Sequence, residues 1–134
     1  MSDHYQRVKE YLQELEMNIT HEDEKEELYM VQDEDRGIIN LVIDCEDPIL
    51  VFEQLIMEVN SEDAGVLCRL LQMNRTLVHG AFVLDEDGKR VFFRDTLQLE
   101  NLDLNEVEGT INSLELALAE YGSELIRFSR AGKA

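Results

Sequence analysis

The longest hydrophobic pattern in the chain lies near its C-terminus and has the spacing of a helix. Successive apolar residues are separated by three or four positions, as in a heptad seam. They are Leu104, Val107, Ile111, Leu114, Leu118, Tyr121, Leu125 and Phe128. Asp103 and Glu106 have the spacing of a capping box, which predicts that the helix begins at residue 104. The seam can pack on a sheet or on a partner helix; its distal part, residues 121–128, is expected to extend beyond the core or to contact a partner.

Two further stretches have apolar residues at helical spacing. The first helix is predicted from His4, because Asp3 and Gln6 resemble a capping box. The other helix is predicted to follow Asn60 or Ser61, either of which can cap it, and to end near residue 74.

Strands are predicted where β-branched and aromatic residues lie between turn residues. The predicted strands cover residues 28–31, 38–43, 77–84 and 90–94, and the last two form a hairpin around the turn at residues 85–88. Residues 49–59 are apolar and could be a strand or a helix; their branched side chains favour a strand. The charged run at residues 21–27 is predicted to be a solvated loop or a ragged strand entry.

These elements predict an α+β fold in the order α-β-β-β-α-β-β-α. Its expected architecture is a twisted antiparallel sheet of about five strands with three flanking helices. A length of 134 residues fits a single domain over residues 1–134.

Charge narrows the classes of partner. The formal net charge is −18, and residues 1–60 contribute −13 of it, from 17 acidic and 4 basic residues. Such a surface disfavours binding to nucleic acids or anionic membranes, and it favours a protein partner with a basic or amphipathic segment. The polar N-terminus and the absence of a long apolar run predict a cytoplasmic protein that does not insert into membranes.

The residues that could carry chemistry do not form a recognisable catalytic or metal-binding motif. Asp85 to Gly88 fails as a calcium loop, since Val83 falls at the first ligand position and Arg94 at the last. His4, His21 and His79 lie far apart in sequence, and Cys45 and Cys68 are expected to be free thiols. The prediction is therefore a protein that is not an enzyme and needs no cofactor.

Several motifs in the second half of the chain follow one another in a familiar order. They are Leu70-Leu71-Gln72-Met73-Asn74, the stretch from Gly80 to Gly88, Val91-Phe92-Phe93-Arg94, and the stretch from Thr96 to Asp103. In this order they resemble the Tir-chaperone-like superfamily, which contains bacterial type III secretion chaperones and YbjN-like proteins. The resemblance is strongest over residues 61–125, and the chain is more similar to the YbjN-like branch.

The resemblance implies a homodimer that holds a segment of a client protein. By similarity to the secretion chaperones, the dimer interface is expected at Leu67, Leu70, Leu71, Met73 and Phe82. Client contacts are expected in the first helix and early strands, at Tyr5, Val8, Leu28, Met30 and Ile39.

Two functions from different classes are therefore considered. The first is a chaperone-like or adaptor protein that binds a partner segment by strand addition or helix docking. The alternative is a regulatory module that senses a small molecule or metal, with His79 and Cys68 at its site.

Overall fold

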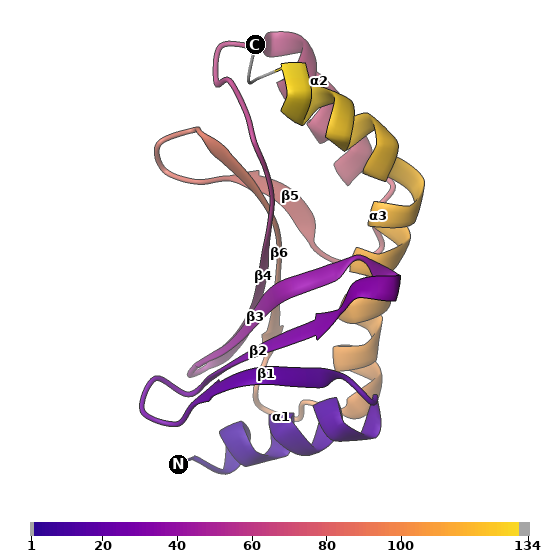
Figure 1. Cartoon of the computed structure of the whole chain (residues 1–134). Coiled ribbons are helices and arrows are strands. Elements are labelled where there is room, and N and C mark those ends of the chain that lie inside the picture. Colours follow the sequence, from indigo (N-terminus) through magenta and orange to yellow (C-terminus); the bar gives the residue numbers. More distant parts are fainter. Residues whose placement is uncertain (1, 132–134) are drawn as a thin grey trace.

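The predicted helices and strands assemble into an antiparallel sheet with three α-helices. A computed structural model describes residues 2–131 (Figure 1). The strands are β1 (Asn18–Asp23), β2 (Leu28–Asp33), β3 (Ile38–Glu46), β4 (Ile49–Glu58), β5 (Ala81–Leu84) and β6 (Arg90–Gln98). The helices are α1 (Asp3–Glu14), α2 (Ala64–Asn74) and α3 (Leu104–Ala131), with a short 3-10 helix, η1 (Glu34–Arg36), between β2 and β3. The predicted α+β class is confirmed.

The sheet has six strands, one more than the sequence predicts. The additional strand is β1, which includes the charged residues His21, Glu22 and Asp23. β1 lies at the edge of the sheet and pairs only with β2, so its charged side chains can remain in water. The charged residues therefore gave no strand pattern in the sequence, although this segment forms a strand through backbone pairing with β2.

The ambiguous stretch at residues 49–59 forms β4, as favoured from its branched side chains. β4 pairs with β3 on one side and β6 on the other, so it is an interior strand of the sheet. The next helix, α2, begins slightly later than predicted. Asp63 caps it, and its carboxylate accepts a hydrogen bond from the Val66 backbone N–H at 3.1 Å.

The predicted second hairpin forms between β5 and β6, but β5 is shorter than the predicted strand. Residues 77–80 instead form a loop that is bonded to α3. The Ser113 hydroxyl accepts a hydrogen bond from the His79 backbone N–H at 3.1 Å and donates one to the His79 carbonyl at 2.7 Å. These two bonds satisfy backbone groups that a strand would otherwise pair.

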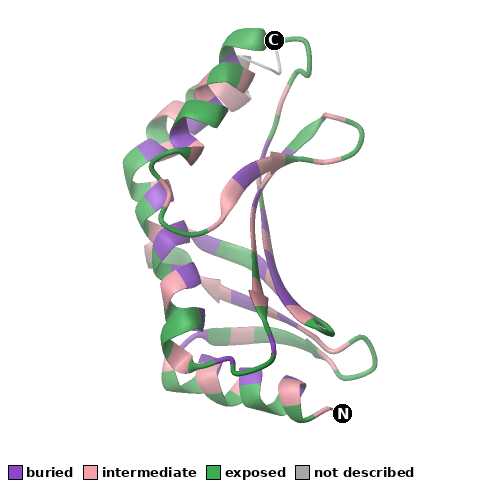
Figure 2. Ribbon diagram, turned by 180° about the vertical axis from the view of Figure 1, so that it is seen from behind, coloured by how far each residue is buried: buried purple, intermediate pink, exposed green. Residues whose placement is uncertain are grey.

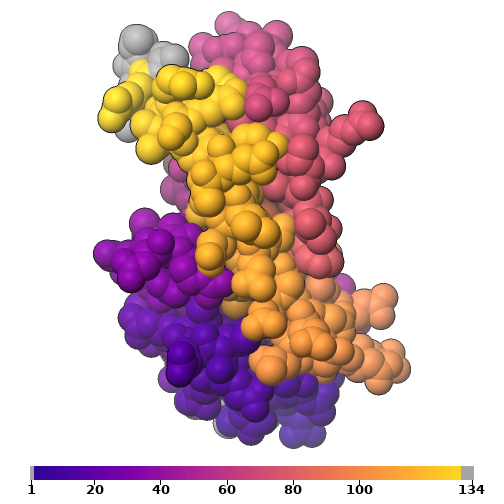
Figure 3. Space-filling view, turned by 90° about the vertical axis from the view of Figure 1, so that its right-hand side faces the viewer, coloured from indigo at the N-terminus to yellow at the C-terminus, as the bar shows by residue number. Residues whose placement is uncertain are grey.

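The order of strands in the sheet is β1-β2-β3-β4-β6-β5, and every neighbouring pair is antiparallel. All three α-helices lie on the same side of the sheet (Figures 1 and 2). Seen from that side, α3 runs along the molecule and lies between the α2 region at one end and the N-terminal segments at the other (Figure 3).

The core between helices and sheet has two parts. The larger part joins α1 and the first half of α3 to the sheet around Tyr29, Phe52 and Phe93. The smaller part joins α2 and the second half of α3 to β4, β5 and β6. In it, Tyr121 and Leu125 are only 6% and 3% exposed. The expectation that residues 121–128 extend beyond the core is therefore wrong, because α2 and the distal parts of β4 and β6 pack against them.

A single glutamine side chain replaces strand pairing where β4 diverges from β3. Pairing between these strands ends at Glu53, and the next residue, Gln54, is 4% exposed. Its carboxamide oxygen accepts a hydrogen bond from the Ile39 N–H, and its nitrogen donates one to the Gly37 carbonyl, both at 3.1 Å. The side chain thus satisfies two backbone groups of the β3 segment that β4 no longer reaches.

Two glycines should respond in opposite directions to substitution by alanine. Gly80 has a φ of +75°, and an added Cβ would lie 2.5 Å from the Phe93 ring. We expect Gly80→Ala to destabilise the fold by about 1–3 kcal/mol from conformation alone, with the steric overlap in addition. Gly122 lies within α3 with nothing within 4 Å of an added Cβ, so Gly122→Ala is expected to stabilise by up to about 1 kcal/mol. Urea denaturation of both variants measures the difference, and equal effects would contradict the structure around Gly80.

Candidate binding surfaces

No helix within residues 2–131 covers the second face of the sheet, which we call the uncovered sheet face (Figure 2). Paired residues on neighbouring strands point to the same face, so the strand register defines this surface in rows. The first row contains His21, Met30, Val42, Glu53, Arg94 and Ala81. The second contains Asp23, Leu28, Asp44, Val51 and Thr96, and the third contains Leu55, Phe92 and Val83.

The centre of the uncovered sheet face is apolar. Val51, Leu55, Phe92 and Val83 lie on the adjacent strands β4, β6 and β5. None of these four side chains belongs to the two core clusters on the helix side. Leu55 is 53% exposed, Phe92 and Val83 are partly exposed, and Val51 is 9% exposed. Leu55, Phe92 and Val83 lie side by side in one row, and adjoining apolar side chains of this kind mark an interaction site more often than isolated ones do.

Charged groups divide and border this apolar centre. Glu53 and Arg94 form an ion pair across β4 and β6, with 3.2 Å between the carboxylate and guanidinium atoms. Toward the β1–β2 and β3–β4 turns, Asp23, Asp44 and Glu46 lie on or beside the second row. The Asp44 Oδ1 atom is shielded from solvent and has no hydrogen-bond partner within the described residues. The acidic end of the face therefore contains a carboxylate oxygen that lacks a donor.

The environment of Asp44 favours its protonated form. Burial raises the pKa of this carboxyl to about 6, and the nearby Glu46 and Glu26 carboxylates contribute to the increase. The neighbouring Cys45 thiol is also buried, and this burial raises its pKa to about 12. A thiol that stays protonated is a poor nucleophile.

We expect the substitution Asp44→Asn to stabilise the protein at pH 7 and to weaken its pH dependence. The folded protein binds the Asp44 proton more tightly than the unfolded chain does, since the pKa rises from 3.8 to about 6. Ionisation of Asp44 therefore does not lower the stability of the fold at pH values below 3.8, and it lowers stability by its full amount at pH values above about 6. Because the group is partly exposed, the gain at pH 7 should be about 1–2 kcal/mol. Urea titrations from pH 4 to 7.5 measure the free energy of unfolding of both proteins. If the variant and the wild type differed in this free energy by the same amount at every pH, the prediction would be wrong.

A second apolar surface lies at the other end of the sheet, between α2 and β5. It forms a cleft of about 290 Å³ lined by Leu67, Leu70, Leu71, Phe82, Val83, Leu84 and Val91. Leu71 is 72% exposed and Leu84 is 41% exposed, so this surface is open to solvent. Of the residues predicted to form a dimer interface, Leu67, Leu70, Leu71 and Phe82 line this cleft. Met73 does not line it, because its side chain is completely buried on the core side of α2.

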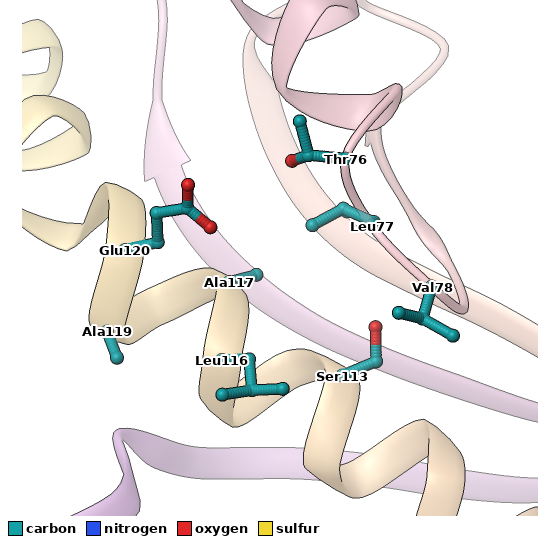
Figure 4. Close-up of a pocket in the computed structure, with 8 residues that line it drawn as sticks. All are labelled: Thr76, Leu77, Val78, Ser113, Leu116, Ala117, Ala119 and Glu120. Atoms are coloured by element: carbon teal, nitrogen blue, oxygen red, sulfur yellow. The ribbon is translucent and has the colours of Figure 1, made fainter.

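A third cleft, of about 390 Å³, lies between α3 and the loop that follows α2 (Figure 4). Thr76, Leu77 and Val78 of the loop face the Ser113–Glu120 segment of α3 across it. Val78 is 76% exposed and Leu116 is 62% exposed. The Thr76 hydroxyl lies 2.6 Å from the Tyr121 hydroxyl, which fixes one end of the loop against the helix.

The five residues predicted to contact a client lie in different parts of the fold. Leu28 and Met30 are on the uncovered sheet face, partly exposed. Ile39 is 50% exposed at the start of β3. Tyr5 and Val8 are 1% and 0% exposed, because they form the contact between α1 and the sheet. In this structure they present no surface to a client, so their predicted client contact is corrected to a role in the core.

The sequence prediction missed Val51, Leu55, Phe92 and Val83, which form the centre of the uncovered sheet face. Their common orientation depends on the pairing of β4 with β6, strands that are separated by α2 and β5. One local signal was present: in β4, Val51 and Leu55 flank Glu53 at alternate positions, as on a half-exposed strand face.

The remaining candidate groups do not converge on a site. Residues 2–131 contain no cluster of three or more His, Cys, Asp or Glu side chains arranged to hold a metal ion. Cys68 is exposed on α2, while His79 lies in the loop beside Gly109 of α3. The Asp85 carboxylate accepts hydrogen bonds from the Lys89 and Arg90 backbone N–H groups, as expected for a hairpin turn. None of the helices in the described residues combines the length and hydrophobicity needed to cross a membrane.

Comparison with known proteins defines the family. The CesT_Tir_1 family model matches residues 1–131, so the chain belongs to this family, as the motifs of its second half indicate. A comparison with curated protein sequences gives no match.

Several solved structures share the fold at low sequence identity. YbjN from E. coli is 13% identical, with a TM-score of 0.69 over 90% of this chain and 92% of that chain. The Yersinia pestis type III secretion chaperone SycH, solved in complex with a stable fragment of YscM2, is 14% identical. Its TM-score is 0.60 over 94% and 99% of the two chains. A chain of the HopA1–SchA chaperone–effector complex is also 14% identical, with a TM-score of 0.59 over 94% of both chains.

Proposed function

We propose that the chain is a non-catalytic, chaperone-like protein that binds a segment of a partner protein in the cytoplasm. The observation that carries the proposal is the uncovered sheet face, where apolar side chains from β4, β5 and β6 have no covering layer. Membership of the CesT_Tir_1 family supports it. Among proteins of the same fold, SycH is described as a type III secretion chaperone in complex with a fragment of YscM2, and another matching chain comes from the HopA1–SchA chaperone–effector complex.

Client contact is proposed on the uncovered sheet face, with Leu28 and Met30 at its acidic end and Ile39 at its border. The net charge of −18 favours a partner segment that is basic or amphipathic. The same charge disfavours nucleic acid as a ligand.

Affinity capture tests the proposed function directly. The tagged chain, incubated with extract of its native cells at low ionic strength, is expected to retain a specific partner protein. That partner should be released as salt rises, because charge attraction steers the association. Retention of no protein above the level of an unrelated protein of equal net charge would contradict the proposal.

The proposal includes a homodimer formed through the cleft between α2 and β5. Leu71 and Leu84 are exposed there beside the edge strand β5, whose residues Ala81–Leu84 carry no charge that would oppose pairing. Light scattering at micromolar concentration is therefore expected to give the mass of two chains.

The substitution Leu71→Asp is expected to convert this dimer to a monomer, with at least a tenfold weaker association. It would place a charge in a buried apolar contact, while a side chain that is 72% exposed contributes little to the fold of one chain. Leu116→Asp is the matched control, since Leu116 is 62% exposed on α3 and is not among the residues that line the cleft. A wild-type mass of one chain, or equal loss in both variants, would contradict the proposed interface.

A further inference from the structure

We propose that the uncovered sheet face binds an amphipathic helix of the partner whose polar side is rich in lysine or arginine. This inference rests on the proposed function and specifies the chemistry of the partner segment. The helix is inferred to lie across β4 and β6, with its apolar side on Val51, Leu55 and Phe92 and a basic side chain at Asp44.

The hydrogen bonding of the sheet favours a helix over an extended segment. β4 and β6 are interior strands: Val51 of β4 lies between paired residues of β3 and β6, and Phe92 of β6 lies between paired residues of β4 and β5. Their backbone groups are therefore already used by neighbouring strands. A segment lying on this face must satisfy its own backbone N–H and C=O groups, which a helix does internally. Helices already cover the opposite face, and a helix layer on the second face is a common way to bury an apolar sheet.

The charges around the face favour a basic partner. At one end, Asp23, Asp44 and Glu46 lie at or near the strand turns, and Asp44 Oδ1 has no donor among the described residues. At the other end, the β5–β6 turn carries Asp85, Glu86 and Asp87. A lysine or arginine can lay its methylene groups over Leu28 and Val51 while its charged end reaches the Asp44 carboxylate.

The same charges argue against a second copy of this chain as the occupant. A two-fold contact between two uncovered sheet faces would bring two sets of acidic turns together, and this repulsion would oppose association. The central Arg94 offers no compensation, because its guanidinium is already paired with Glu53.

Designed peptides test the inference. We would use three synthetic peptides of about 18 residues: a helix with leucine on one side and lysine on the other, the same helix with glutamate for lysine, and a scrambled version of the first. Isothermal titration at physiological salt is expected to show binding of the leucine–lysine helix alone. Equal binding of the scrambled peptide would overturn the inferred helix, and binding of the glutamate peptide would overturn the inferred charge.

Variants locate the binding site. Leu55→Lys and Thr96→Lys, both at exposed positions of the uncovered sheet face, should each weaken binding of the leucine–lysine helix at least tenfold. Asp44→Asn should weaken it about threefold to tenfold. Leu116→Lys, the same kind of change at an exposed position of α3, should alter it less than twofold. Circular dichroism confirms that each variant is folded.

Two outcomes overturn the inference while leaving the proposed function intact. The first is unchanged peptide binding by Leu55→Lys and Thr96→Lys. The second is an equal loss in Leu116→Lys, which would move the site to the cleft beside α3. If the wild-type chain retains a native partner but the partner binds these variants equally well, the protein binds its client on another surface. If the wild-type chain retains no partner, the proposed function itself fails.

Discussion

The substitution Tyr5→Ala is expected to lower the free energy of unfolding by about 3–5 kcal/mol. Tyr5 is 1% exposed, and its ring stacks on Tyr29 with a centroid distance of 4.3 Å and an interplanar angle of 6°. The Tyr5 hydroxyl donates to the Leu28 carbonyl at 3.3 Å, and the Tyr29 hydroxyl donates to the Tyr5 carbonyl at 2.8 Å. Removal of the ring opens a cavity and loses one of these bonds, which loosens α1 from the sheet.

The matched control is Ile39→Ala, because both residues were predicted to contact a client. Ile39 is 50% exposed, so its truncation should change stability by no more than about 0.5–1 kcal/mol. Urea denaturation measures both values. Similar small effects in the two variants would mean that Tyr5 does not have the structural role assigned to it.

The substitution Gln54→Met is expected to cost about 2–5 kcal/mol, although it preserves the size of the side chain. Methionine cannot replace the hydrogen bonds that Gln54 makes with the Ile39 N–H and the Gly37 carbonyl. Both backbone groups would be left without a partner beside a side chain that is 4% exposed. Hydrogen exchange at the Ile39 amide should accelerate more than the global loss of stability requires.

An exposed glutamine supplies the comparison for this prediction. Gln98, at the end of β6, is exposed, and Gln98→Met should leave stability within about 0.5 kcal/mol of the wild type. If Gln54→Met were equally neutral, the separation of β4 from β3 would not depend on the Gln54 side chain.

Most helices and strands could be predicted because the spacing of apolar residues and the capping residues that define them lie within the segment itself. The heptad spacing of α3, together with the Asp103 cap, predicted its start at Leu104; the Asp103 carboxylate accepts a hydrogen bond from the Glu106 N–H at 2.8 Å. The strand β1 was missed because its charged side chains are tolerated only through its edge position, which is a property of the sheet and not of the segment.

The arrangement of the candidate site depends on contacts that the sequence does not record locally. Phe92 and Phe93 are adjacent and chemically identical, yet Phe93 is buried in the core and Phe92 faces outward in the row with Leu55. Only the register between β4 and β6 decides which ring points to which side. The family resemblance led to the expectation of a protein that binds a client segment. It also placed client contacts at Tyr5 and Val8, which the packing of α1 on the sheet buries.

Site-specific photocrosslinking tests the central claim, that this chain binds a partner protein through its uncovered sheet face. A photoreactive amino acid would replace Leu55 in one sample and Leu116 in another, and each would be irradiated with native cell extract at low salt. Both positions are more than half exposed, so each can react with a bound protein. The structure predicts a discrete covalent product from position 55 and none from position 116. A product from position 116 alone, or none from either position when the partner is retained, would contradict the claim.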